Sequence, residues 1–186
     1  MYKNKSLEKY VNDLAGKFSA PGGGSAACLV SCLGVSLLEM AVNFTLGKSA
    51  FAKYNKSLKK TLIACALLRK IFLGLLDADV SAYLNKDKDK SLKVPLKACE
   101  FSLKGMRLLP GLTLKINPAL ASDLVMAGIL LEAGFTSAYY NVEINLKNIK
   151  DARKVKGIRK DLSGKIRLLR KIRQDLEAEG GKIIRR

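Results

Sequence analysis

The sequence contains no histidine and no tryptophan, and the missing histidine limits the chemistry that the chain can perform. Without an imidazole, Ser-His-Asp and Cys-His arrangements are excluded. Any acid or base in catalysis must then be Asp, Glu, Lys, Tyr or Cys. Cys28 and Cys32 are one helical turn apart, but no histidine is present to complete a usual zinc site. We therefore expect no metal site.

Cysteine is also scarce, and the four cysteines lie inside apolar stretches with helical spacing: Cys28, Cys32, Cys65 and Cys99. This placement favours reduced, buried thiols over a disulfide framework, and it is typical of a cytosolic protein. The N-terminus lacks the apolar core of a signal peptide. The longest apolar runs stay below the roughly 20 residues that a membrane span needs. The sequence therefore predicts a soluble, cytoplasmic protein with no membrane partner.

No segment alternates polar and apolar residues with a period of two, so we expect an all-α fold. With 186 residues, 48% of them hydrophobic, the chain is long enough for a single domain, 1–186, with a real core. We predict a bundle of long antiparallel helices over residues 5–17, 25–46, 50–84, 95–108 and 117–148, followed by a basic helix over about 151–186. A charged loop is expected at 85–90, before Pro95.

The predicted helix over 117–148 has an unusual composition. Asn117 can cap it, and Pro118 sits at the first helical position, where its missing N–H costs nothing. One face carries a stripe of mostly small and polar residues: Asp123, Ala127, Leu130, Gly134, Ser137, Asn141, Asn145 and Asn148. The stripe suits close helix packing with a few satisfied buried amides. The alternative is a ligand groove with a carboxylate at one end and amides at the other.

Two further segments allow a structural and a functional interpretation. The turn Ser19–Ser25, with three glycines, is either a hinge before a buried helix or a turn whose N–H groups face a ligand at a helix N-terminus. It is not a P-loop. Asp77 and Asp79 lie about 200° apart on their helix, so one can point inward while the other stays in water. The inward aspartate is a candidate base; the alternative is two solvated aspartates.

Charge is one-sided, with a net charge of +18, and residues 147–186 hold 15 Lys and Arg against 5 Asp and Glu. Apolar residues recur through this tail at helical spacing, which predicts an amphipathic basic helix. The helix either packs on the core as a solvated final element or offers an electrostatic surface to nucleic acid or anionic lipid. It supplies no aromatic side chains for base stacking, so nucleic acid is not the expected partner.

Six sequence blocks, in order, carry a resemblance to a known family. They are Ser19–Ala27 (SAPGGGSAA), Asn43–Lys48 (NFTLGK), Asp77–Tyr83 (DADVSAY), Val94–Leu96 (VPL), Asn117–Asp123 (NPALASD) and Asn141–Leu146 (NVEINL). Over about residues 5–150 the chain resembles the cyclodeaminase/cyclohydrolase family. That family comprises the cyclodeaminase domain of formiminotransferase-cyclodeaminase and its stand-alone bacterial relatives, including methenyltetrahydrofolate cyclohydrolases.

The resemblance implies an all-helical subunit, usually a homodimer, that acts on a one-carbon tetrahydrofolate, with or without a polyglutamate tail, and has no covalently bound cofactor. In cyclodeamination, N10 of the folate attacks the formimino carbon on N5 and ammonia leaves. In cyclohydrolysis, water attacks the methenyl carbon between N5 and N10. A partly buried carboxylate, whose pKa burial raises, can transfer the protons in either reaction. The resemblance does not distinguish the two activities.

The resemblance also assigns roles to residues. Asp79 is the expected acid/base, Asp77 the fallback, and Asp123 a second polar group near the pterin or the reacting carbon. The expected substrate-binding residues are Pro21, Gly22, Gly23, Gly24 and Ser25, which form a wall against the flat ring, together with Thr45, Lys48, Asn117, Ser122, Asn141 and Asn145. Asn117, Ser122, Asn141 and Asn145 would supply hydrogen bonds, and Lys48 would attract the glutamate carboxylates.

The chain departs from the family between Tyr83 and Val94, where relatives usually have a longer segment. The short segment could remove part of the folate pocket. The alternative that stays open is therefore a divergent, non-catalytic helical module that binds acidic partners such as nucleic acid through its basic tail.

Overall fold

The computed structural model describes residues 1–185, and every regular element in that range is helical. The α-helices are α1 (Leu7–Ala15), α2 (Gly23–Thr45), α3 (Asn55–Leu84), α4 (Lys88–Met106), α5 (Ala121–Leu146) and α6 (Ala152–Ile184). Short 3-10 turns cover Tyr2–Asn4, Ser49–Tyr54 and Pro118–Leu120. The predicted all-α fold is confirmed for these residues.

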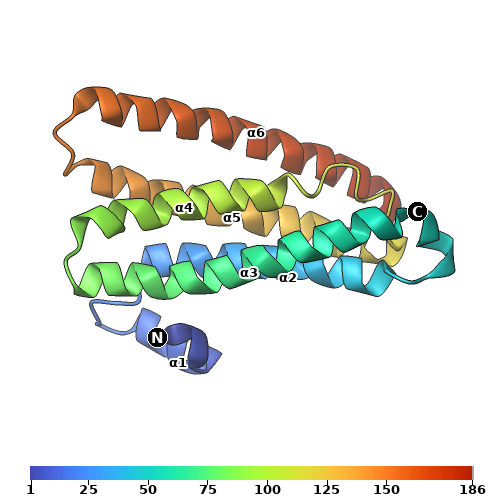
Figure 1. Cartoon of the computed structure of the whole chain (residues 1–186), viewed down its shortest axis with the longest axis horizontal. Coiled ribbons are helices and arrows are strands. Elements are labelled where there is room, and N and C mark those ends of the chain that lie inside the picture. The colour runs from blue at the N-terminus through green and yellow to red at the C-terminus, as the bar shows by residue number, and fades with distance from the viewer. Residues whose placement is uncertain (186) are drawn as a thin grey trace.

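Helices α2 to α5 run up and down beside one another, so that consecutive helices are antiparallel (Figure 1). Helix α6 lies along α5 and α4, and α1 sits apart at one end of the bundle (Figure 1). We call that end the turn end; it holds Gly23, Leu84, Lys88 and Leu146. The opposite end, the far end, holds Thr45, Asn55, Met106 and Ala121.

Small residues bring α2 and α5 into close contact at the centre of the bundle. A Cβ added to Gly134 would lie 2.0 Å from Ser31 Oγ, so only glycine fits at this crossing. The Ser31 and Ser102 hydroxyls are 2.8 Å apart, and Ser102 donates to the carbonyl of Ala98, so both buried hydroxyls are hydrogen-bonded. The middle of the predicted stripe on α5 therefore serves close packing.

The start of α4 differs from the sequence prediction. The helix begins at Lys88, not at Pro95, because the Asp87 side chain accepts a hydrogen bond from the Lys90 N–H at 3.0 Å and caps it. Pro95 lies inside the helix and is buried. The expected charged loop over 85–90 is reduced to the turn Asn85–Asp87.

Helix α6 packs on the bundle. Leu162, Leu169 and Leu176, spaced by seven residues, are buried. Arg159 forms an ion pair with Glu143 of α5, and Arg173 pairs with Glu132. The interpretation of the tail as a final helix packed on the core is confirmed, and its remaining lysines and arginines lie mostly on the solvent side.

Helix α2 and the segment Pro118–Leu146 have the length and apolar composition of a membrane span, so the expectation that no apolar stretch reaches that length is wrong. One side of each builds the core. The other side is apolar and uncovered on a surface that both helices share, which we call the α2/α5 face. Its residues are Ala26, Val30, Leu33, Leu37, Met40 and Phe44 of α2 and Met126, Ile129, Leu130, Ala133, Tyr140 and Ile144 of α5.

The four cysteines are buried and free, as expected. Burial raises the pKa of the Cys65 thiol to about 12, so this thiol stays protonated at neutral pH.

We predict that Gly134→Ala lowers the free energy of unfolding by about 1–3 kcal/mol, because the added methyl group overpacks the contact with Ser31. The matched control is Gly74→Ala in α3, where an added Cβ meets nothing within 4 Å. This control should stabilise the helix by up to about 1 kcal/mol. Urea unfolding of both variants checks the pair; equal effects would contradict the close crossing of α2 and α5.

Candidate active site

A cavity of about 290 Å³ opens at the turn end, where α2, α3, α4 and α5 meet. Its lining combines a glycine-rich backbone, one carboxylate and two amides. The residues are Ser19, Ala20, Gly22, Gly23, Gly24, Asp79, Tyr83, Ser91, Asn141, Ile144 and Asn145. We call this the inner cavity. Within residues 1–185, no group of three or more His, Cys, Asp or Glu side chains is placed to hold a metal ion.

Asp79 reaches the inner cavity because α2 begins with glycine. A Cβ added to Gly24 would lie 2.2 Å from Asp79 Oδ1, so the first turn of α2 lies directly against the carboxylate. Gly23 sits beside the Asn141 amide, with 3.6 Å from an added Cβ to Asn141 Nδ2. The glycines of the turn therefore allow the backbone to approach both polar groups closely.

The surroundings of Asp79 change its acidity. Burial raises the pKa of this carboxyl above its ordinary value, and the backbone N–H of Ser25 opposes the rise in part. Behind it, the buried Tyr10 hydroxyl and Ser25 Oγ are 3.1 Å apart. Burial also raises the pKa of Tyr10, so the phenol stays neutral. Asp79 is thus the carboxyl group that the inner cavity offers for proton transfer.

Asp77 has a different environment. It is buried, and its Oδ1 accepts hydrogen bonds from the backbone N–H groups of Tyr2 at 2.6 Å and Lys3 at 3.3 Å. The expectation that one aspartate of the pair stays in water is therefore wrong. Asp77 holds the N-terminal turn against α3, and it is absent from the lining of the inner cavity.

The two predicted asparagines on α5 line the inner cavity one helical turn apart. Asn141 Nδ2 donates to the Ser137 carbonyl at 2.9 Å, and Asn145 Nδ2 donates to the Asn141 carbonyl at 2.8 Å. These bonds fix both amides along the helix, so each can present its remaining polar groups to a ligand. At this end, the stripe on α5 is part of a ligand-sized cavity.

Comparisons with known proteins agree with this geometry. Residues 6–88 and 84–164 match the Formiminotransferase-cyclodeaminase family. The chain belongs to this family. It is 28% identical to methenyltetrahydrofolate cyclohydrolase of Methylorubrum extorquens, over 88% of this chain and 90% of the relative.

Other members of the formiminotransferase-cyclodeaminase family are also similar. Identity to formimidoyltransferase-cyclodeaminase of Rattus norvegicus is 28%, over 78% of this chain but only 31% of that longer protein. The chain thus spans about a third of the bifunctional relatives. The crystal structure of formiminotetrahydrofolate cyclodeaminase from Thermotoga maritima has the same fold, with a TM-score of 0.82, 23% identity and coverage of 98% of this chain and 97% of that one.

The six sequence blocks that carry the resemblance to the formiminotransferase-cyclodeaminase family separate into two groups in space. Blocks Ser19–Ala27, Asp77–Tyr83, Val94–Leu96 and Asn141–Leu146 belong to helices that meet at the turn end. Blocks Asn43–Lys48 and Asn117–Asp123 lie together at the far end, where the Asn117 N–H donates to Thr45 Oγ1 at 3.0 Å.

Five predicted site residues are consequently not near Asp79 in their own chain: Thr45, Lys48, Asn117, Ser122 and Asp123. Along α5, Asp123 and Asn141 are 18 residues apart, which is about 27 Å at 1.5 Å per residue. Within one chain these residues therefore lie apart from the inner cavity, because the antiparallel course of α2 and α5 places the two groups of blocks at opposite ends. Of the remaining predicted residues, Pro21 and Ser25 are buried beneath the turn.

Sequence reasoning missed several residues of the inner cavity. Tyr83 and Ser91 lie on either side of the turn between α3 and α4, and Tyr10 supports the site from α1. Tyr83 is the last residue of the DADVSAY block, so its place in that block could have marked it as a site residue. Tyr10 had no such signal, because it reads as an ordinary apolar position of an amphipathic helix.

We predict that Asp79→Asn stabilises the fold at neutral pH. The raised pKa of Asp79 means that the folded protein favours the protonated carboxyl, so ionisation costs stability as pH rises through that pKa. The variant and the wild type should therefore unfold alike at acid pH, and the variant should become the more stable of the two towards neutral pH. Thermal unfolding across pH measures the difference; a variant that is less stable at neutral pH would contradict the assignment.

Proposed function

We propose that the chain is an enzyme of one-carbon tetrahydrofolate metabolism, a methenyltetrahydrofolate cyclohydrolase or a formiminotetrahydrofolate cyclodeaminase. The observation that carries the proposal is the partly buried Asp79 carboxylate against the Gly24 backbone in a family of this activity. The printed names of the similar proteins support both activities. The tetrahydrofolate derivative is the substrate, and no covalently bound cofactor is required.

In the cyclohydrolase reaction, Asp79 in its ionised form takes a proton from the water that attacks the methenyl carbon. The same proton then goes to the folate nitrogen whose bond to that carbon breaks, and the remaining hydroxyl proton of the adduct is released to solvent as the formyl C=O forms. In the cyclodeaminase reaction, N10 attacks the carbon of the protonated formimino group, and Asp79 moves the proton from N10 to the resulting amino nitrogen, which leaves as ammonia while the methenyl cation forms. Burial helps in both cases, because a base is most effective when its pKa lies nearer the working pH.

The walls of the inner cavity would position the flat pterin. The backbone of Gly22–Gly24 carries no side chains, so a ring can lie against it, and the N–H groups of the first turn of α2 face a carbonyl or an anion favourably. Asn141 and Asn145 would hydrogen-bond the edge of the ring. A cytoplasmic location remains part of this proposal.

The proposal predicts that the chain interconverts methenyl- and formyl-tetrahydrofolate, or forms methenyl-tetrahydrofolate with release of ammonia. Absorbance of the methenyl form, followed in both directions with and without ammonia, separates the two reactions. Asp79→Asn should lower kcat by about 10²–10⁴-fold, the usual contribution of a general acid or base. As the matched control, Asp77→Asn should keep its turnover while losing stability.

An inactive wild-type chain in both directions would contradict the proposed function and favour the non-catalytic helical module. In an active chain, kcat/KM at acid pH should fall with an apparent pKa above the ordinary aspartate value, as burial of Asp79 requires.

We further propose that the chain forms a homodimer through the α2/α5 face. This face is apolar over the length of two helices, and side chains such as Leu33 and Phe44 are 50% and 61% exposed. A two-fold axis perpendicular to α2 and α5 would pair the face with itself, as a symmetric dimer requires. It would also bring the far end of the partner subunit beside the inner cavity. The two groups of family blocks would then meet across the interface.

Mixing of inactive variants tests this arrangement. If Asp79 of one subunit and Asp123 of the other serve one site, Asp79→Asn and Asp123→Asn are each inactive alone. After subunit exchange, half of the dimers are mixed, and each mixed dimer has one intact site, so activity should return to about a quarter of wild type. No recovery after verified exchange would contradict a shared site.

Leu33→Glu, which places a charge on the apolar α2/α5 face, should yield monomers in sedimentation.

A further inference from the structure

A second, larger cavity of about 560 Å³ adjoins the inner cavity at the turn end. Its lining is Ser19, Tyr83, Leu84, Lys86, Lys88, Ser91, Asn145 and Asn148, and we call it the outer cavity. The two cavities share Ser19, Tyr83, Ser91 and Asn145, so they form one continuous cleft. The inner part carries a carboxylate and the outer part carries two lysines, so the cleft is electrically polarised along its length.

Lys86 occupies a position where the local backbone favours glycine. Its φ is +53°, in the left-handed region that side chains with a Cβ rarely adopt. The turn follows the end of α3, with the Lys86 N–H donating to the Tyr83 carbonyl and the Asp87 N–H donating to the Ala82 carbonyl. Glycine is the usual residue at such a helix end. A lysine here therefore costs stability, which suggests a role outside the fold.

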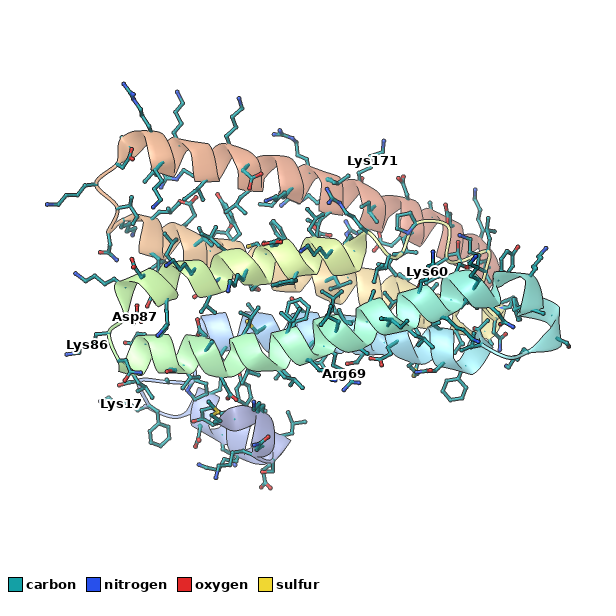
Figure 2. The ribbon with its side chains drawn as sticks, viewed as in Figure 1. Lys17, Lys60, Arg69, Lys86, Asp87 and Lys171 are labelled. Carbon is teal, nitrogen blue, oxygen red and sulfur yellow. The ribbon has the colours of Figure 1, made fainter. Side chains whose placement is uncertain are left out.

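Lys88 is likewise placed against local preference. It is the first residue of α4, where the partial positive charge of the helix N-terminus disfavours a cation. The nearby Asp87 is already engaged by Lys90, with 3.1 Å between Oδ2 and Nζ. Among the ion pairs of residues 1–185, none involves Lys86 or Lys88. Lys86 and Lys88 thus line the outer cavity as two cations outside any of these ion pairs, and Figure 2 shows Lys86 at the turn end.

We propose that Lys86 and Lys88 bind the glutamate carboxylates of the folate substrate and so orient it, with the pterin at Asp79 and the tail across Tyr83 towards solvent. This inference rests on the proposed function. Every folate ends in a glutamate with two carboxylates, and added glutamates add one more each. The outer cavity supplies the matching charge, and Tyr83, 62% exposed and shared by both cavities, supplies a flat surface for the apolar linker between them.

The two lysines lie at the connection between α3 and α4. The short turn Asn85–Asp87 brings α4 to within three residues of α3 and places both cations at the cleft. Lys48, the residue expected to meet the glutamate, lies at the far end of its own chain. Within one chain, the lysines that line the cleft are therefore Lys86 and Lys88, in the segment expected to be a charged loop.

The test uses the full-length chain with Lys86→Gly, Lys88→Gln and the double variant. KM and kcat are measured for monoglutamyl and triglutamyl methenyl-tetrahydrofolate, and binding is measured separately with 5-formyl-tetrahydrofolate carrying one or three glutamates. The controls are Lys60→Gln and Lys171→Gln, which remove the same charge away from the turn end (Figure 2).

For the double variant we expect KM and the dissociation constant for the triglutamyl forms to rise about 5- to 20-fold, from two partly exposed charge contacts, with kcat unchanged. The effect should be smaller for the monoglutamyl forms and should shrink with added salt. Lys86→Gly should at the same time raise Tm by roughly 2–4 °C, because it relieves the left-handed position. Weaker binding in a more stable protein cannot result from damage to the fold.

The inference is overturned if the double variant binds both triglutamyl ligands as the two control variants do. It is also overturned if monoglutamyl and triglutamyl ligands lose affinity equally, because the lysines would then not bind the added glutamate carboxylates. If the wild type turns over neither substrate, the proposed function fails on its own, and the binding of 5-formyl-tetrahydrofolate still decides the role of Lys86 and Lys88.

Discussion

The contact between Gly24 and Asp79 is the constraint on which the site depends. A backbone without a Cβ lets the first turn of α2 cover a carboxylate near the end of α3, and this cover removes water from one side of the acid. A methyl group at Gly24 would occupy the position of the carboxylate oxygen. The glycine-rich turn therefore does more than connect α1 to α2: it creates the burial that raises the pKa of the acid.

The bundle organises the remaining groups around this contact. Because α2 and α5 are antiparallel, the N-terminus of α2 meets Asn141 and Asn145, whereas Thr45 meets Asn117 at the other end. One chain thus carries two separate polar clusters joined by an apolar face. The proposed symmetric pair of chains would bury that face and unite the clusters, and it would account for two long apolar helices that are only partly covered in one subunit.

The sequence predicts the helices well, together with several residues that line the inner cavity, and the reasons for its errors are local. Helical period and the cap at Asn117 fix most elements, and the block pattern selects Asp79, Gly22–Gly24 and Asn141. Pro95 misleads because proline is a weak stop signal once Asp87 has capped the helix upstream. Asp77 and Tyr10 depend on tertiary contacts with distant segments, which no local pattern encodes.

Titration of the Asp79 carboxyl itself tests the central claim most directly. The carboxyl ¹³C resonance of the wild type, assigned by its loss in Asp79→Asn, reports the protonation of this one group in the unliganded protein. Burial against Gly24 and Ser25 predicts a midpoint clearly above the ordinary value of 3.8. A midpoint at or below 3.8 would show a solvated carboxylate and would contradict the account.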